Sequence, residues 1–72
     1  MNENEKELQI LEILGEEGPL HARTIAEIVD EHPLSVDRIC SRLHQVGDIH
    51  SCKRGHFQLT ERGKMRLTRE FS

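Results

Sequence analysis

The sequence predicts a small, mostly helical α+β domain, in which a helix, a short strand, two helices, a β-hairpin and a last helix follow one another. Apolar residues recur at helical spacing through most of the 72-residue chain, which predicts amphipathic helices. One stretch near the C-terminus instead alternates apolar and polar residues around a glycine, which indicates a hairpin. A chain of this length is typical of one small domain, and we expect residues 1–72 to form it.

The first helix is predicted to run from about Glu3 to Leu14. Acidic residues at its start suit the positive end of the helix dipole, and Gly15 and Gly18 lie just past its expected end. Its apolar residues cover more than the single stripe that a helix of a small monomer needs. They are Leu8, Ile10, Leu11, Ile13 and Leu14. We expect this surplus to face either the rest of the core or a second subunit.

The middle of the chain predicts two short helices in close succession. Leu20-His21 is a candidate short strand, and the helix near Ala22–Val29 has apolar residues at i, i+3, i+4 and i+7. After a break at residues 30–32, a third helix is expected over about 33–46, with Pro33 at the first position, where its missing N–H costs nothing. Two short helices joined by so tight a break are typical of a helix-turn-helix.

A β-hairpin and a last helix complete the prediction. Ile49–Cys52 and His56–Leu59 are short alternating runs joined by Lys53-Arg54-Gly55. Phe57 and Leu59 are expected to face the core, because alternate residues of a strand share a face.

The last helix is expected to begin after Thr60, which can cap it, and to end near Phe71. Gly63 lies inside this helix, where glycine costs roughly 1 kcal/mol relative to alanine. We therefore expect a close backbone contact at Gly63.

The charge is distributed unevenly along the chain. Residues 1–31 carry nine acidic and two basic residues, a net charge of −7, whereas residues 32–72 carry four acidic and eight basic residues, a net charge of +4. The overall charge of −3 conceals this difference. A cationic half suggests a polyanionic partner on that side of the molecule.

Several classes of protein are disfavoured. Two cysteines, Cys40 and Cys52, are too few for a disulfide-rich secreted scaffold, and the polar, acidic N-terminus does not resemble a signal peptide. No apolar run is long enough to span a membrane, so we expect a soluble, cytoplasmic protein. The chain has no recognisable nucleophile with an adjacent base and no phosphate-binding glycine loop. We therefore expect no enzymatic activity, no catalytic residues and no cofactor.

Three segments, taken in order, resemble the winged helix-turn-helix transcriptional regulators, especially the MarR-like and phage-repressor-like kind. GPLHARTIAEIV (18–29) is similar to the opening of that family's helix-turn-helix, and HPLSVDRICSRLHQVGDI (32–49) is similar to its recognition helix and following strand. FQLTERGKMRL (57–67) resembles the strand and helix that follow the wing. The resemblance covers nearly the whole chain. It implies a hairpin wing at 49–59 and sequence-specific binding of double-stranded DNA in transcription regulation.

This resemblance implies a DNA-binding surface built from three elements. The recognition helix, about 33–46, would lie in the major groove, and the wing would contact the adjacent backbone or minor groove. The start of the second helix would contact a phosphate group of the DNA backbone. The candidate DNA-binding residues are Arg23, Ser35, Arg38, Ser41, Arg42, Gln45, Lys53 and Arg54. Arginine suits this role because its planar fork can bond O6 and N7 of guanine together. A homodimer through the first helix, joined by the last helix and its Met65, would match a palindromic site.

Two other interpretations stay open. A winged helix used only for contact with another protein fits the acidic N-terminal half and the acidic residues at the turn.

The second is a regulator that senses metals or redox state. It fits the cysteines and histidines, since Cys40 and His44 stand at i, i+4 and His50, Cys52 and His56 occur in the hairpin. Cys52 is the redox candidate because two cations follow it. Cys40, however, lies on the apolar stripe of its helix, where cysteine usually behaves as a small hydrophobe, so we expect no metal site.

Overall fold

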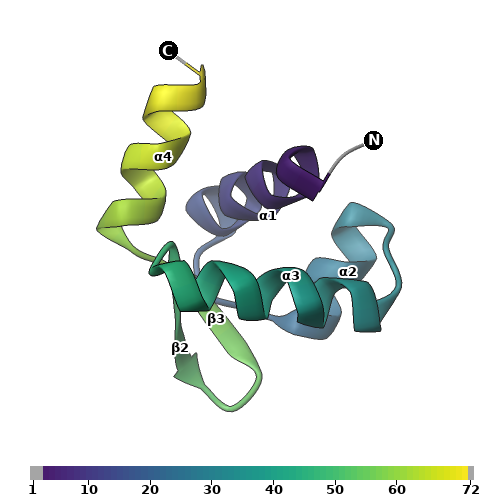
Figure 1. The fold of residues 1–72 in the computed structure, drawn as a ribbon. Helices are drawn as coiled ribbons and strands as arrows, with labels where there is room; N and C mark the ends of the chain where they lie inside the picture. Colours follow the sequence, from purple (N-terminus) through teal and green to yellow (C-terminus); the bar gives the residue numbers. More distant parts are fainter. Residues whose placement is uncertain (1–2, 72) are drawn as a thin grey trace.

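The computed structural model describes residues 3–71, which form four helices and a three-stranded antiparallel sheet (Figure 1). The elements are α1 (Glu3–Glu17), β1 (Leu20–His21), α2 (Ala22–Val29), α3 (Pro33–Val46), β2 (Ile49–Lys53), β3 (His56–Leu59) and α4 (Glu61–Phe71). The predicted α+β class, mostly helical, and the predicted order of elements are confirmed. No helix in the described part of the chain has the length and apolar character needed to cross a membrane.

The first helix is longer than predicted, because Gly15 lies inside it and not beyond its end. A Cβ at Gly15 would lie 3.3 Å from Cδ2 of Leu59 and 3.8 Å from Cδ1 of Leu67, so the small residue lets α1 approach the hairpin and α4 closely. The helix ends before Gly18, whose φ of 85° suits a residue without a Cβ. The predicted end at Leu14 is therefore wrong, and α1 continues for three more residues, to Glu17.

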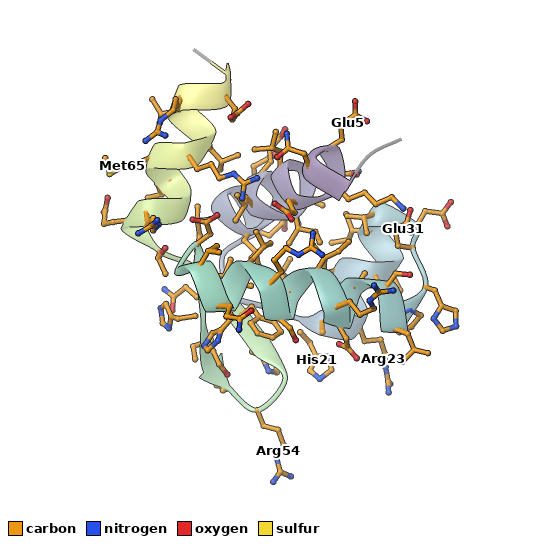
Figure 2. All side chains as sticks on the ribbon, in the orientation of Figure 1. Glu5, His21, Arg23, Glu31, Arg54 and Met65 are labelled. Atoms are coloured by element: carbon orange, nitrogen blue, oxygen red, sulfur yellow. The ribbon has the colours of Figure 1, made fainter. Side chains whose placement is uncertain are left out.

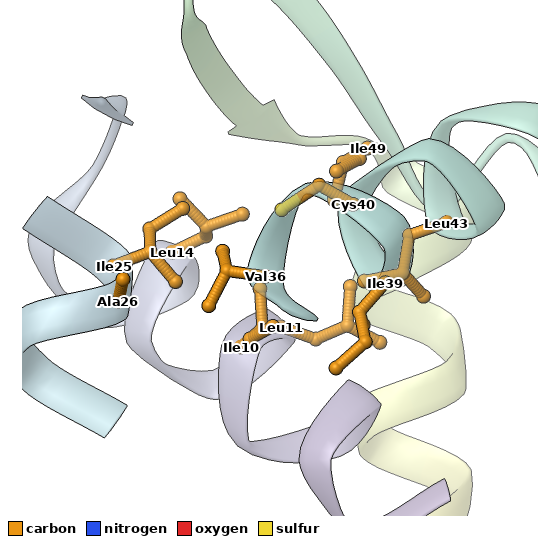
Figure 3. Close-up of a cluster of buried hydrophobic side chains, with 10 residues drawn as sticks. All are labelled: Ile10, Leu11, Leu14, Ile25, Ala26, Val36, Ile39, Cys40, Leu43 and Ile49. Atoms are coloured by element: carbon orange, nitrogen blue, oxygen red, sulfur yellow. The ribbon is translucent and has the colours of Figure 1, made fainter. Parts of the chain in front are cut away.

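The core accounts for the surplus apolar residues of α1. Its buried members come from α1, α2, α3 and the first residue of β2 (Figure 3). They are Ile10, Leu11, Leu14, Ile25, Ala26, Val36, Ile39, Cys40, Leu43 and Ile49. Among the described residues, the large apolar side chains that remain exposed are Ile28, Leu34, Val46 and Met65, none of which belongs to α1. The structure therefore favours the expectation that the surplus apolar residues of α1 face the core of the same chain.

Both middle helices begin at a histidine whose ring caps the helix. Nδ1 of His21 accepts a hydrogen bond from the N–H of Arg23 at 3.0 Å, and Nδ1 of His32 accepts one from the N–H of Leu34 at 3.1 Å. The sequence did not reveal these caps, because serine, threonine, aspartate and asparagine are the usual cap residues. Asp30, with φ of 56°, ends α2 and turns the chain toward α3.

The sheet joins the hairpin to the start of α2. Its strand order is β1-β3-β2, so β3 lies in the centre and pairs Leu20 with Phe57 and His21 with His56. Strand β2 reaches Lys53, one residue further than predicted, because a bulge after Ser51 brings Lys53 opposite His56. Phe57 packs against the core, as predicted.

Helix α4 is attached to the rest of the molecule at its first turn. The Thr60 hydroxyl donates to the carbonyl oxygen of Gly47 at 2.6 Å and accepts from the N–H of Gly63 at 3.1 Å. The N–H of Thr60 donates to the carbonyl oxygen of Asp48 at 3.1 Å. Gly63 is buried against that same carbonyl, so the predicted close backbone contact is confirmed.

A second attachment of α4 is a cluster of charges around Arg66. Its guanidinium donates to Oδ2 of Asp48, Oε1 of Glu7 and Oδ1 of Asn4, each at 2.8 Å. Burial alone would lower the pKa of Arg66, but the hydrogen bonds to Asp48 and Glu7 and the attraction of their negative charges together outweigh it and raise that pKa. The two buried carboxylates thus receive charged partners, and α1, the α3–β2 turn and α4 are joined at one point.

Candidate nucleic-acid interface

The bend of the hairpin is fixed to the start of α2. The carbonyl oxygen of Gly55 accepts from the N–H of Ala22 at 2.9 Å, and Gly55 has a φ of 74°. The His21 ring fills the space beside this glycine and meets the His56 ring edge to face, with centroids 5.0 Å apart. Since the His21 ring also caps α2, one side chain sets the position of the hairpin relative to the helix.

Two of the candidate arginines project from this junction. Figure 2 shows Arg23 and Arg54 on the same side of the molecule, with His21 between them. Both arginines are exposed, and neither forms an ion pair within the described part of the chain. Lys53 is also exposed, at the end of β2. The structure therefore brings the cation at the helix start and the cation at the hairpin tip to one side of the molecule.

Gly55→Ala is expected to lower the free energy of unfolding by about 2 kcal/mol. A left-handed backbone costs an alanine about 1 kcal/mol. The new Cβ would also lie 2.6 Å from Nε2 of His21. Either the ring leaves its capping position, which costs about 1 kcal/mol, or the bend moves away from α2. Urea unfolding followed by circular dichroism measures the change.

Gly18→Ala is the matched control for this substitution. Gly18 also has a positive φ, 85°, but nothing lies within 4 Å of a Cβ built there. The stability that Gly18→Ala loses therefore reports the backbone cost alone. We expect Gly18→Ala to cost about 1 kcal/mol. Equal losses at Gly18 and Gly55 would contradict the role given to the His21 ring.

The exposed face of α3 carries further candidates. Arg38, Ser41 and Gln45 are exposed, whereas Ser35 is half-buried. Leu34 shares this face, because residues 34, 38, 41 and 45 follow helical spacing, and it is 67% exposed. The face therefore offers one cation, two neutral hydrogen-bonding groups and an apolar side chain that is suited to a thymine methyl or to a protein.

Arg42 is held by a buried carboxylate. Its guanidinium lies 3.5 Å from Oε2 of Glu7, a residue that is 8% exposed. Arg42 also borders a hollow of about 90 Å³ between α1 and α3. The hollow is lined by Lys6, Ser35, Arg38, Ile39 and Arg42. The cations of α3 therefore lie on the flank that faces α1.

Lys6 is the cation that sequence reasoning missed. It stands in an acidic segment, and only the packing of α1 against α3 brings it to the hollow. Its ammonium group also lies 3.0 Å from a carboxylate oxygen of Glu31, which is one of the acidic residues at the turn. Asp30 and Asp37 are two further acidic residues near α3, both exposed, and Asp37 lies on the flank opposite Arg42.

The cysteines and histidines of the described residues form no metal-binding cluster. Cys40 is fully buried, and burial, with a smaller contribution from the Asp37 carboxylate, raises the pKa of its thiol to about 11. The thiol thus stays protonated at neutral pH. His44, at i+4, is exposed while Cys40 faces the core. In residues 3–71, no three His, Cys, Asp or Glu side chains are grouped to hold a metal ion. Cys52 is exposed on β2.

Comparison with known proteins gave no match: no protein-family model fits the sequence, and no curated protein or solved structure is significantly similar. What the chain does is therefore inferred from its own residues and geometry.

Proposed function

We propose that this chain is a winged helix-turn-helix protein that binds double-stranded DNA sequence-specifically and regulates transcription. Helix α3, residues 33–46, lies in the major groove, and the hairpin 49–59 is the wing on the adjacent backbone or minor groove. The element order and the small antiparallel sheet, in which β1 precedes α2 and pairs with the hairpin, support this assignment.

The observation that carries the proposal is the junction between the hairpin bend and α2. Arg23 and Arg54 project to one side, and the hydrogen bond from the N–H of Ala22 to the carbonyl oxygen of Gly55 holds their backbones at a fixed separation. Fixed cations on one side suit a regular array of phosphates, because each neutralised phosphate releases a counterion. Figure 2 shows Glu5 of α1 on the side of the molecule away from Arg23 and Arg54.

Within α3, the candidates divide by their surroundings. Arg38 has no ion pair in the described residues and can reach a base edge, where Ser41 and Gln45 on the same face add hydrogen bonds. Arg42 is oriented by Glu7, which suits a contact with the phosphate backbone. Lys6 adds a cation beside it.

Salt dependence of duplex binding tests the proposal. A fluorescent duplex of two helical turns and mixed sequence is titrated with the protein at several salt concentrations, and binding is followed by anisotropy. Replacing Arg23 and Arg54 with alanine together is expected to weaken all duplexes alike and to reduce the slope of log K against log salt by about 2 units. Lys64→Ala, which removes an exposed cation from α4, is the matched control and should leave the slope unchanged.

Base preference is tested by selecting bound sequences from a random library. Arg38→Ala should relax the preference at one base position, which corresponds to about 1–3 kcal/mol of discrimination. Absence of duplex binding at low salt would overturn the proposal as a whole. An unchanged slope in the Arg23 and Arg54 double variant would overturn the assigned interface.

A second candidate function is contact with another protein through the same domain. It is favoured by the exposure of Leu34 at 67% and Ile28 at 49% on neighbouring helices. This function becomes the preferred interpretation if the protein does not bind the duplex at low salt. In that case Leu34→Asp is expected to abolish binding of the protein partner.

A further inference from the structure

The outer face of α4 has an arrangement that the DNA proposal does not use. Helix α4 stands at the edge of the molecule and extends away from its body (Figure 1). Gly63, Arg66 and Leu67 face inward. The outer row consists of Glu61, Met65 and Arg69, spaced i, i+4, i+8. Rows with this spacing form ridges on a helix surface, and the ridges of two crossing helices interdigitate.

Met65 is the apolar centre of this row. It is 61% exposed, and Figure 2 shows its side chain on the outer side of the helix. Hollows of about 600 Å³ and about 330 Å³ lie on its two sides. The larger hollow also contains Val46, which is 47% exposed. The row thus combines a protruding apolar side chain with an adjacent hollow that contains another apolar side chain.

The charges at the two ends of the row are complementary to each other. If two copies of α4 cross antiparallel at Met65, Glu61 of each copy lies opposite Arg69 of the other, because both are four residues from Met65. The Glu61 side chain is 85% exposed, and in the described residues its only close cation is the exposed Lys64 of the same helix, at 3.8 Å. Arg69 is also exposed, so both side chains can reach a partner helix. A parallel crossing at Met65 would instead oppose like charges. A two-fold axis needs this kind of self-complementary surface.

We propose that this face of α4 binds a second copy of this chain, with the two helices antiparallel and each Met65 entering the hollow beside Val46 of the other copy. The proposal is independent of DNA binding, and it moves the dimer surface from the first helix, whose apolar residues are mostly buried, to α4. Contact through one short helix is small, which predicts a weak, concentration-dependent dimer.

Charge exchange between Glu61 and Arg69 tests this pairing in the absence of DNA. Sedimentation equilibrium over a range of protein concentrations gives the dimer dissociation constant. Glu61→Arg and Arg69→Glu each set like charges against each other at two symmetric positions, and each is expected to weaken the dimer roughly tenfold. The double variant restores opposite charges and is expected to recover the affinity. An equimolar mixture of the two single variants is expected to form heterodimers.

Controls separate the pairing from general effects of charge. Glu16→Arg makes the same change of charge on an exposed position of α1 and should leave the dissociation constant unchanged. Circular dichroism of each variant checks that it is folded. The proposal is overturned if the unmodified protein stays monomeric at every concentration, if neither single variant weakens the dimer, or if the double variant and the mixture fail to recover it.

Discussion

Arg66→Ala is expected to lower the free energy of unfolding by about 3 kcal/mol, the largest effect that the structure predicts for a single substitution. The change leaves the carboxylates of Glu7 and Asp48, both buried, without their closest cation. This loss is at the low end of the range for breaking a buried ion pair, because the Arg66 side chain is 23% exposed and water can take its place. Urea unfolding of the variant, followed by circular dichroism, measures it.

The position of Arg66 explains why one side chain has so large an effect. Its hydrogen bonds reach Asn4 and Glu7 on α1 and Asp48 in the α3–β2 turn, so its removal loosens contacts among three parts of the chain. Arg62 also lies 3.9 Å from Asp48, but its side chain is 74% exposed, so we expect it to compensate for little of the loss. Helix α4 is therefore expected to detach before the rest of the molecule unfolds.

Two comparisons isolate this effect. Lys64→Ala removes an exposed cation from the same helix and is expected to change stability by less than about 0.5 kcal/mol. Asp48→Asn is expected to cost less in the Arg66→Ala background than in the unmodified protein, because the charge it removes has already lost its closest partner there. If Arg66→Ala costs no more than Lys64→Ala, the cluster does not hold α4.

Local signals were sufficient to predict most of the fold. Pro33 marks the start of α3 and Thr60 the start of α4 through the chemistry of these residues themselves, and both helices begin where these residues predict. Gly15 was misread because glycine near the end of a helical pattern usually stops it. Its actual reason, the close approach of Leu59 from β3, depends on residues far away in the sequence.

Less of the candidate site could be predicted from the sequence, because its contacts also join residues that are far apart in the chain. Arg23, Arg38 and Arg54 could be named from their elements alone. The pairing of Arg42 with Glu7 could not, because 35 residues separate the two. The role of the His21 ring beside Gly55 likewise appears only when β1 pairs with β3.

Gly63→Ala is expected to lower the free energy of unfolding by about 2 kcal/mol, although alanine is the better helix former by about 1 kcal/mol. A Cβ at Gly63 would collide with the carbonyl oxygen of Asp48 and would lie 2.7 Å from Cδ1 of Leu59. A backbone carbonyl cannot turn aside as a side chain can, so α4 itself must move. That movement strains the hydrogen bonds of Thr60 to Gly47 and Asp48, which begin the helix.

Gly15→Ala provides the matched control, since both glycines lie inside helices. At Gly15 the nearest atom to the new Cβ is the end of a leucine side chain at 3.3 Å, which can shift by a few tenths of an ångström. The gain in helix propensity is then mostly kept, and Gly15→Ala is expected to change stability by less than about 1 kcal/mol in either direction. If the carbonyl of Asp48 is the obstacle, thermal and urea unfolding of the two variants will show a clear loss of stability for Gly63→Ala and little change for Gly15→Ala. A Gly63→Ala protein as stable as the Gly15→Ala protein would show that α4 can move away from Asp48 at little cost.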